Sequence, residues 1–296
     1  MLVDYHVHTE FSNDCIVPMA EQCQAAIAAG ISQIVFTEHE ENNPREYLPY
    51  SFDHPAYLRE MAACRARFGD RLAIRAGIEI SEPHCHAEAA ERVLARYPWD
   101  FVLGSLHWLD ADTNALSRDF FVRFGDWRES FRAYFREMQV MARQGDFDIL
   151  AHLDYPARYA GPYCDNAYDI SVYEAEIRPV LSALIARGKG IEINTASLRR
   201  RLPAACPPQV VVNWYREMGG TILTVGSDAH RAHDVGADIT AALGMARTAG
   251  FTHIAVYERR QPTLVAIDEV NFIPVSSSSH QRNMYNQHRS GNGAVW

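Results

Sequence analysis

The sequence lacks the marks of a membrane-bound, secreted or disulfide-stapled protein. No apolar run reaches the roughly 18–20 residues that a membrane-spanning helix needs, so we expect no membrane contact. Residues 1–4 supply neither a basic nor an apolar region, which predicts that no signal peptide directs secretion. None of the six cysteines stands in a C-x-x-C pair, so we expect reduced thiols and a cytoplasmic location.

Positive charge is also scarce. The 28 Lys and Arg residues face 37 Asp and Glu residues, which leaves a formal net charge of −9 at pH 7. A long nucleic acid would need a basic face, so we expect none as a partner, whereas a few local cations suffice for a small phosphorylated substrate. Hydrophobic residues make up 48% and charged residues 22%, which is typical of a globular chain with a sizeable core and not of disorder.

Short apolar runs, each followed by polar residues and then a helical pattern, recur along the chain. Helices are predicted from Pro18, which fits a first helical turn, towards Gly30, and over residues 56–68 and 87–96. Alternating strands and helices predict an α/β fold with a parallel sheet, and about 250 residues suffice for one (β/α) barrel. The predicted strands contain residues 2–5, 34–36, 72–80, 101–103, 148–151, 191–193 and 222–225, with a further candidate at 254–256.

Two segments depart from this alternation. Residues 108–145 are long and rich in aromatic side chains, which indicates a helical excursion packed on the barrel wall; a lid over the site is the alternative. Residues after about Pro274 are polar and poor in apolar side chains. We therefore predict a single domain over residues 1–274 and a flexible C-terminal tail over residues 275–296.

Six of the predicted strands end in side chains that can bind a metal ion. The carboxyl ends of barrel strands converge on one face, and residues i and i+2 of a strand point to the same side. Several imidazoles and carboxylates buried together need a compensating charge, which metal ions supply. The candidate ligands are His6, His8, His39, Glu79, His107, His152, Asp228 and His230.

These motifs, taken in order, resemble those of the polymerase-and-histidinol-phosphatase (PHP) superfamily. The first motif is Asp4-x-His6-x-His8-Thr9, with Ser12 and Asp14 soon after. The later motifs are Thr37-Glu38-His39, Gly77-Ile78-Glu79, Gly104-Ser105-x-His107, Ala151-His152-x-Asp154 and Gly226-Ser227-Asp228-Ala229-His230. The resemblance runs from Asp4 to about Gly236 and implies a distorted seven-stranded (β/α) barrel, a TIM-like fold, with a site for three divalent metal ions.

The resemblance also assigns the ligands to the three ions. One ion is held by His6, His8, Glu79 and Asp228; Glu79 bridges to a second ion held with His107 and His152; the third is held by Asp14, His39 and His230. Mixed imidazole and carboxylate ligands suit Zn, Fe or Mn. Candidate acids that orient the ligating imidazoles are Asp4, Glu38 and Asp154.

The chemistry of such a site is phosphoester hydrolysis. A metal-bridging hydroxide attacks phosphorus while the ions neutralise the phosphoryl oxygens. Arg158 and Arg199 resemble the arginines of the histidinol-phosphate phosphatase branch that contact the substrate phosphate. Ser197 stands where that branch often has Gly, and Arg200 and Arg201 are adjacent alternatives to Arg199. We therefore expect hydrolysis of L-histidinol phosphate in histidine biosynthesis. Asp14, Asp228 or a metal-bound water is the candidate proton donor.

Other functions stay open at this point. A PHP phosphoesterase acting on nucleoside monophosphates or nucleic-acid ends is one, a C–N hydrolase of related barrel type is another, and a non-catalytic module binding a metal or phospho-ligand is a third. The oligomeric state is also open. The remaining histidines are interpreted as rim or helix-start residues (His84, His86), surface residues (His54, His253, His280, His288) and a loop residue (His233).

Overall fold

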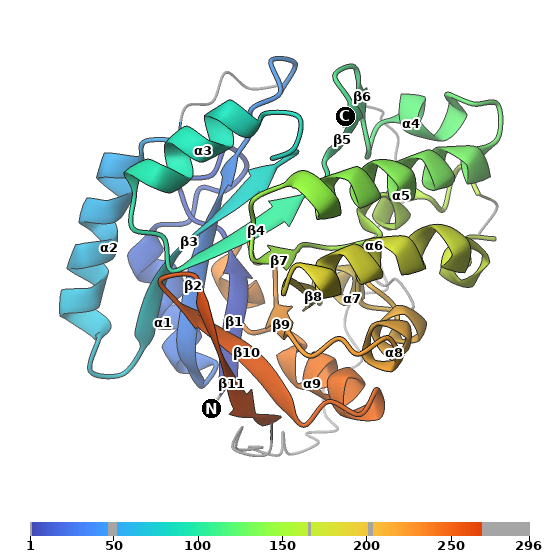
Figure 1. Ribbon diagram of the computed structural model, residues 1–296. Coiled ribbons are helices and arrows are strands. Elements are labelled where there is room, and N and C mark those ends of the chain that lie inside the picture. Colours follow the sequence, from blue (N-terminus) through green and yellow to red (C-terminus); the bar gives the residue numbers. More distant parts are fainter. Residues whose placement is uncertain (1, 47–51, 165–166, 201–203, 268–296) are drawn as a thin grey trace, which may run out of the picture.

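Seven parallel strands form the sheet at the centre of the molecule (Figure 1). The computed structural model describes residues 2–46, 52–164, 167–200 and 204–267. The sheet order is β1-β2-β3-β4-β7-β8-β9, and each strand overlaps one of the seven predicted apolar runs. The strands are β1 (Leu2–Val7), β2 (Ile31–Glu40), β3 (Ala73–Ser81), β4 (Phe101–Ser105), β7 (Ile149–Leu150), β8 (Gly190–Asn194) and β9 (Leu223–Gly226).

The last strand returns to the first and nearly closes the barrel. Val7 and Ala229 form an isolated parallel bridge. The Asp228 N–H donates to the carbonyl of His6 at 2.7 Å, and the His8 N–H donates to the carbonyl of Ala229 at 3.0 Å. The closing hydrogen bonds therefore lie at the carboxyl ends of β1 and β9, among residues that the sequence predicts to be metal ligands. The predicted seven-stranded barrel is confirmed.

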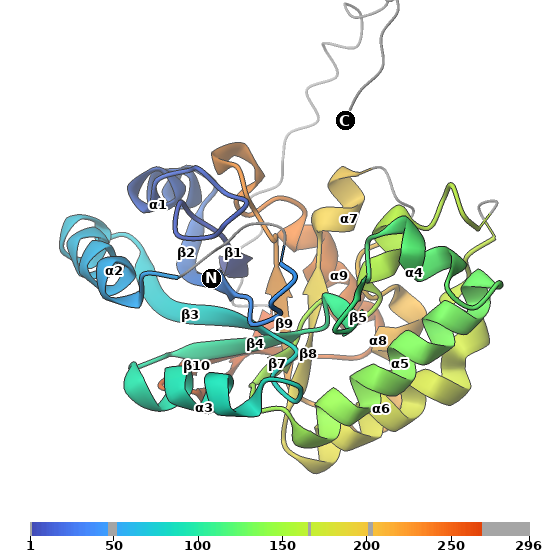
Figure 2. The same ribbon diagram turned by 90° about the horizontal axis from the view of Figure 1, so that it is seen from above.

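Helices surround the sheet on its outer side, as the view from above shows (Figure 2). In α1, Met19, Cys23 and Ala26 are buried at the predicted helical spacing, and Gly30 after the helix has a φ of 74°, a conformation that glycine adopts readily. In α2, the Asp53 side chain caps the first turn. These outer helices are α1 (Met19–Ala28), α2 (His54–Phe68), α3 (Ala87–Arg96), α6 (Glu174–Ala186), α8 (Gln209–Glu217) and α9 (Ile239–Thr248).

The aromatic segment after β4 is mainly helical and packs on the barrel wall, as predicted. It begins with a short hairpin of β5 (Trp108–Asp110) and β6 (Thr113–Asn114), which the sequence did not predict, and continues in α4 (Arg118–Val122) and α5 (Trp127–Gln144). Helix α5 lies beside α6 (Figure 1). The rings of Phe131 and Phe135 are fully buried and lie 5.7 and 5.4 Å from that of Tyr173 at the start of α6.

The eighth apolar run does not join the barrel. It forms β10 (His253–Glu258), which pairs antiparallel with β11 (Gln261–Ala266). The hairpin is bound to the amino-terminal side of the strands: the Tyr257 N–H donates to the Tyr5 hydroxyl at 2.7 Å, and Arg260 pairs with Asp148, just before β7, at 3.0 Å. It covers the end of the barrel opposite the candidate ligands.

Short helical turns complete the connections near the carboxyl ends of the strands. They are η1 (Tyr155–Tyr159), η2 (Ile170–Tyr173), α7 (Ala196–Arg199) and η3 (Ala232–Asp234). The predicted tail over residues 275–296, and the domain boundary before it, lie outside the described residues. Within the part of the chain that the structure describes, every helix is too short or too polar to cross a membrane.

Gly226 provides a test of barrel closure. A Cβ atom at this position would lie 2.4 Å from the His6 Cβ, so β1 and β9 must separate to admit one. We expect Gly226→Ala to lower the free energy of unfolding by about 1–3 kcal/mol. The measurement is the thermal midpoint of unfolding.

Gly244→Ala is the matched control, because Gly244 lies within α9 and a Cβ there meets nothing within 4 Å. Helix propensity predicts a gain of up to about 1 kcal/mol for this variant. Equal midpoints for the two variants would contradict the account of closure.

Candidate metal centre

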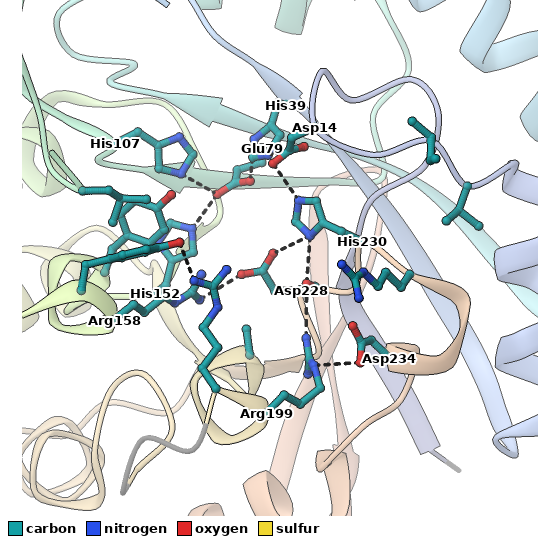
Figure 3. Close-up of a pocket in the computed structure, with 18 residues that line it drawn as sticks. Asp14, His39, Glu79, His107, His152, Arg158, Arg199, Asp228, His230 and Asp234 are labelled. Carbon is teal, nitrogen blue, oxygen red and sulfur yellow. Dashed lines mark hydrogen bonds and ion pairs between the residues drawn. The ribbon is translucent and has the colours of Figure 1, made fainter. Parts of the chain in front are cut away.

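Seven of the nine predicted ligands line one cavity (Figure 3), and the other two, His6 and His8, are buried against Glu79 at its floor. The cavity has a volume of about 860 Å³, within the usual range for sites of small ligands. His6 lies in β1, His39 in β2 and Glu79 in β3, and the other ligands follow β1, β4, β7 and β9. The cavity is lined by Asp14, Ile16, Val17, His39, Glu79, His107, Leu116, His152, Tyr155, Arg158, Tyr159, Ala196, Arg199, Arg200, Asp228, His230, Arg231 and Asp234.

The first group of ligand atoms comes from β1, β3 and the turn after β9. His6 Nε2 and His8 Nε2 are 3.1 Å apart. Glu79 Oε2 lies 3.4 and 3.6 Å from these two nitrogens, and Asp228 Oδ1 lies 3.7 and 3.5 Å from them. Tetrahedral ligands with bonds of about 2.0–2.2 Å are separated by roughly 3.3–3.6 Å. The four atoms therefore have the spacing of ligands to one ion.

The second group shares Glu79. Its Oε1 atom lies 2.8 Å from His152 Nε2 and 3.4 Å from His107 Nε2. Because Oε2 of the same carboxylate belongs to the first group, Glu79 has the position of a bridging ligand. The parallel pairing of β2 and β3 places His39 directly beside Glu79, with His39 Nδ1 3.1 Å from Oε2.

The third group is the most open. Asp14 Oδ1 lies 3.4 Å from His39 Nε2, and Asp14 Oδ2 lies 3.1 Å from His230 Nε2. The Asp14 side chain is 53% exposed and comes from the loop after β1, whereas most of the other ligands are buried. This group is therefore the one that an incoming molecule meets first.

The electrostatics of the cluster fit bound cations. Burial raises the pKa of the Glu79 carboxyl, but the imidazoles around it outweigh burial and hold that pKa well below its usual range. Burial lowers the pKa of His6, but the carboxylates of Glu192, Asp228 and Glu79 outweigh burial and raise that pKa well above its ordinary value. For His8, burial and the neighbouring imidazoles act together and lower the pKa to about 3. Glu79 Oε2 is buried and accepts no well-formed hydrogen bond from the described residues, as suits an oxygen that binds cations.

The three acids predicted to orient imidazoles have different partners. Asp4 accepts hydrogen bonds from the Ser227 N–H and the Gly236 N–H, both at 2.8 Å, so it anchors the segment after β9 and contacts no imidazole ring among the described residues. Asp154 accepts from the Cys206 thiol and likewise reaches no ring in this part of the chain. The side chains of these two acids are taken up by neighbouring loops, so neither orients an imidazole by direct contact in the part of the chain described here.

Glu38 does act on an imidazole, through one intermediate group. Its Oε2 accepts from the Ser12 hydroxyl at 2.6 Å, and that hydroxyl lies 3.0 Å from His8 Nδ1. Glu38 also accepts from the Thr9 N–H at 2.9 Å. The carboxylate thus fixes both the turn after β1 and the orientation of the His8 ring.

Two acids that sequence reasoning missed contact the imidazoles directly. Glu192 Oε2 lies 3.0 Å from His6 Nδ1, and Oε1 accepts from the His152 N–H at 2.8 Å. Glu41 Oε1 lies 2.8 Å from His107 Nδ1. Glu192 lies within the predicted strand of residues 191–193, between two isoleucines, and an acid at such a position is a usable signal. Glu41 is one of several acids at the end of β2, and the sequence offers no way to choose it.

The two predicted arginines both line the cavity. Arg158 is buried, pairs with Asp228 Oδ2 at 2.9 Å and donates to Asn194 Oδ1 at 2.8 Å. Arg199 donates to the carbonyl of Ser227 at 2.6 Å and pairs with Asp234 at 3.2 Å.

The alternatives proposed for Arg199 have different placements. Arg200 lies at the exposed rim against the Tyr159 hydroxyl. Arg201 lies outside the described residues.

Two histidines are more buried than the sequence indicates. His54 was predicted at the surface, but its side chain is 12% exposed, pairs with Glu40 at 3.0 Å and stacks on Tyr97. His84 was predicted at the rim, but it lies away from the cavity with a side chain only 3% exposed.

The other histidines set aside from the site lie mainly as predicted. His86 stands at the start of α3, His233 and His253 are exposed, and His280 and His288 lie outside the described residues.

Comparisons with known proteins agree with the fold and with the motifs. The PHP domain family matches residues 4–196. A probable histidinol-phosphatase from Deinococcus radiodurans is 31% identical over 242 residues, which cover 79% of this chain and 88% of the relative. The histidinol-phosphatase of Lactococcus lactis subsp. lactis is 28% identical over 259 residues, which cover 86% of this chain and 94% of the relative.

A solved structure matches as well. It is the crystal structure of histidinol phosphate phosphatase from Lactococcus lactis subsp. lactis, complexed with zinc, L-histidinol and phosphate. The TM-score is 0.78 at 26% identity, and the match covers 88% of this chain and 98% of that one. The resemblance inferred from the ordered motifs is confirmed.

Glu192 offers a test of how the cluster is held. We expect Glu192→Gln to weaken metal retention about 10–100-fold, because the amide no longer supplies a negative acceptor to His6 Nδ1. The measurement is the metal content of the protein after dialysis against a graded series of chelator concentrations.

Glu217→Gln, in the exposed part of α8, is the control and should retain metal as the parent does. Unchanged circular dichroism of the Glu192 variant separates weaker binding from misfolding. If Glu192→Gln retained metal as the parent does, the role of Glu192 in holding His6 for metal binding would be contradicted.

Proposed function

This chain belongs to the PHP domain family, and from that premise we propose that it hydrolyses L-histidinol phosphate to L-histidinol and phosphate, as a metal-dependent phosphomonoesterase of histidine biosynthesis. The observation that carries the proposal is that one cavity presents both the clustered imidazoles and carboxylates and the guanidinium groups of Arg158 and Arg199. The names of the relatives agree with it, and so does the ligand set of the matching solved structure.

The proposed centre takes three divalent ions, of zinc, iron or manganese. When bound, such ions activate water and neutralise phosphoryl oxygens. The first group would hold one ion, Glu79 would bridge it to a second held with His107 and His152, and Asp14, His39 and His230 would hold the third. None of the three groups contains a thiolate among the described residues, and such a ligand set suits any of these metals.

The arginines are proposed to bind the substrate phosphate. A guanidinium has five N–H donors, and Arg158 uses one nitrogen for both Asp228 and Asn194. Its Nε atom is buried and has no hydrogen-bond partner among the described residues. The Tyr155 ring lies beneath the guanidinium, 5.1 Å from it, which fixes its plane. Arg158 is therefore oriented with donors to spare for phosphate oxygens.

We propose that water, and not the Asp14 or Asp228 carboxyl, donates the proton to the leaving alkoxide. Burial raises the pKa of Asp228, but His6 and Arg158 outweigh burial and hold that pKa well below its usual range. Asp14 behaves alike, since His39 and His230 lower its pKa despite burial. Both groups are therefore ionised at neutral pH, and we propose that water in the open cavity supplies the proton.

The decisive experiment is a phosphate-release assay with zinc or manganese present. L-Histidinol phosphate is compared with AMP and p-nitrophenyl phosphate, and His8→Ala serves as the inactive control. We expect L-histidinol phosphate to have by far the highest kcat/KM and the variant to be inactive. A higher kcat/KM for AMP would retain the metal centre and overturn the substrate. No turnover of any substrate by protein that holds metal would favour a binding module.

Substitution of Arg199 tests the phosphate contact. We expect Arg199→Gln to lower kcat/KM for L-histidinol phosphate about 10–100-fold, the effect of losing a hydrogen bond from a charged group worth about 1.5–3 kcal/mol. Arg200→Gln is the matched control, because that side chain is exposed at the rim, and a smaller effect is expected. Equal losses in the two variants would place the phosphate contact elsewhere.

A further inference from the structure

A second group of metal-binding side chains lies outside the cavity. His84 and Cys85 follow β3, and Glu137 lies on α5. His84 Nε2 is 2.7 Å from Glu137 Oε1 and 3.4 Å from Cys85 Sγ, and Cys85 Sγ is 3.9 Å from the same oxygen. None of the three lines the cavity of the proposed phosphatase site, so the group has no part in that reaction.

Each side chain is available to a cation. The His84 ring is 3% exposed, and its Nε2 is the nitrogen that faces Glu137 and Cys85; it binds a cation when the ring proton moves to Nδ1, which has no hydrogen-bond partner among the described residues. Cys85 is the exposed cysteine of the chain, since the other five are buried. Glu137 is partly exposed, which leaves a path from solvent.

The three atoms match the preferences of zinc. Imidazole nitrogen, thiolate sulfur and carboxylate oxygen are its common ligands, and their separations in a tetrahedral site are roughly 3.3–3.7 Å. The nitrogen–sulfur distance of 3.4 Å already fits, whereas the nitrogen–oxygen distance of 2.7 Å must open by about 0.6 Å and the sulfur–oxygen distance of 3.9 Å must close by about 0.2 Å. We propose that His84, Cys85 and Glu137 form a separate site for one zinc-like divalent cation, with water as the fourth ligand.

The site fastens the turn after β3 to α5. The N–H groups of Cys85 and His86 both donate to the carbonyl of Glu82, at 2.9 and 3.1 Å. The Glu82 side chain accepts from the N–H groups of His107 and Trp108, at 2.5 and 3.0 Å. A cation held by His84, Cys85 and Glu137 thus joins α5 to this turn, whose own hydrogen bonds already hold the backbone of His107.

Cobalt(II) is the probe for this site, because thiolate bound to cobalt gives an intense charge-transfer absorption that imidazole and carboxylate ligands do not. The holoenzyme is titrated anaerobically with Co²⁺. We expect a band that saturates at one equivalent, is abolished in Cys85→Ser and requires at least about tenfold more Co²⁺ in His84→Gln. His86→Gln, which alters the histidine on the other side of Cys85, is the matched control and should keep the band.

The outcomes separate this site from the phosphatase centre. Phosphate release by Cys85→Ser should equal that of the parent, which also shows that the variant folds. Absence of the band in the parent, or its persistence in Cys85→Ser, would overturn the proposal.

Thiol labelling gives an independent measurement. Zn²⁺ added to the holoenzyme should slow alkylation of Cys85, and His84→Gln should lose that protection. Labelling indifferent to Zn²⁺ would likewise refute the site, and neither result depends on the substrate of the phosphatase centre.

Discussion

The carboxylate of Glu79 is the constraint around which the molecule is arranged. It is fully buried at the end of β3, and imidazole nitrogens lie 2.8–3.6 Å from its two oxygens. A buried carboxylate costs a great deal of free energy unless charge and hydrogen bonds compensate it. A barrel offers that compensation because each strand end adds a side chain from a different direction. Five histidines from four separate strand ends surround Glu79, and each has a ring nitrogen near one of its oxygens.

Other buried acids hold the chain that carries the ligands. Asp4 binds the backbone after β9, Glu38 binds the turn after β1, and Glu192 binds both a ring and a backbone N–H. Each of them connects segments far apart in the sequence. The distances between ligand atoms therefore depend on carboxylates that never enter the cavity, and a substitution at one of these acids changes the geometry of the whole cluster.

The sequence predicted the strands, and the clustering of the candidate ligands at their ends, far better than the supporting contacts. Strand ends are readable because apolar runs stop where polar ligands begin, and all seven runs became strands of the sheet. Asp14 came only from the family resemblance, since a loop has no periodicity. Glu41 and the burial of His54 were out of reach, because their partners are brought close only by tertiary packing. The eighth run was ambiguous because a short continuous apolar run suits a hairpin strand as well as a barrel strand.

The seam between β1 and β9 has a consequence for the fate of the protein in a cell. The backbone hydrogen bonds that close the ring belong to His6, His8 and Asp228, whose side chains also form the cluster, so closure of the fold and assembly of the metal cluster involve the same residues. A ligand that binds only the closed ring stabilises it by mass action. The folded fraction, and with it exposure to proteases, is then governed by the metal supply, so that metal starvation lowers the amount of the enzyme as well as its activity.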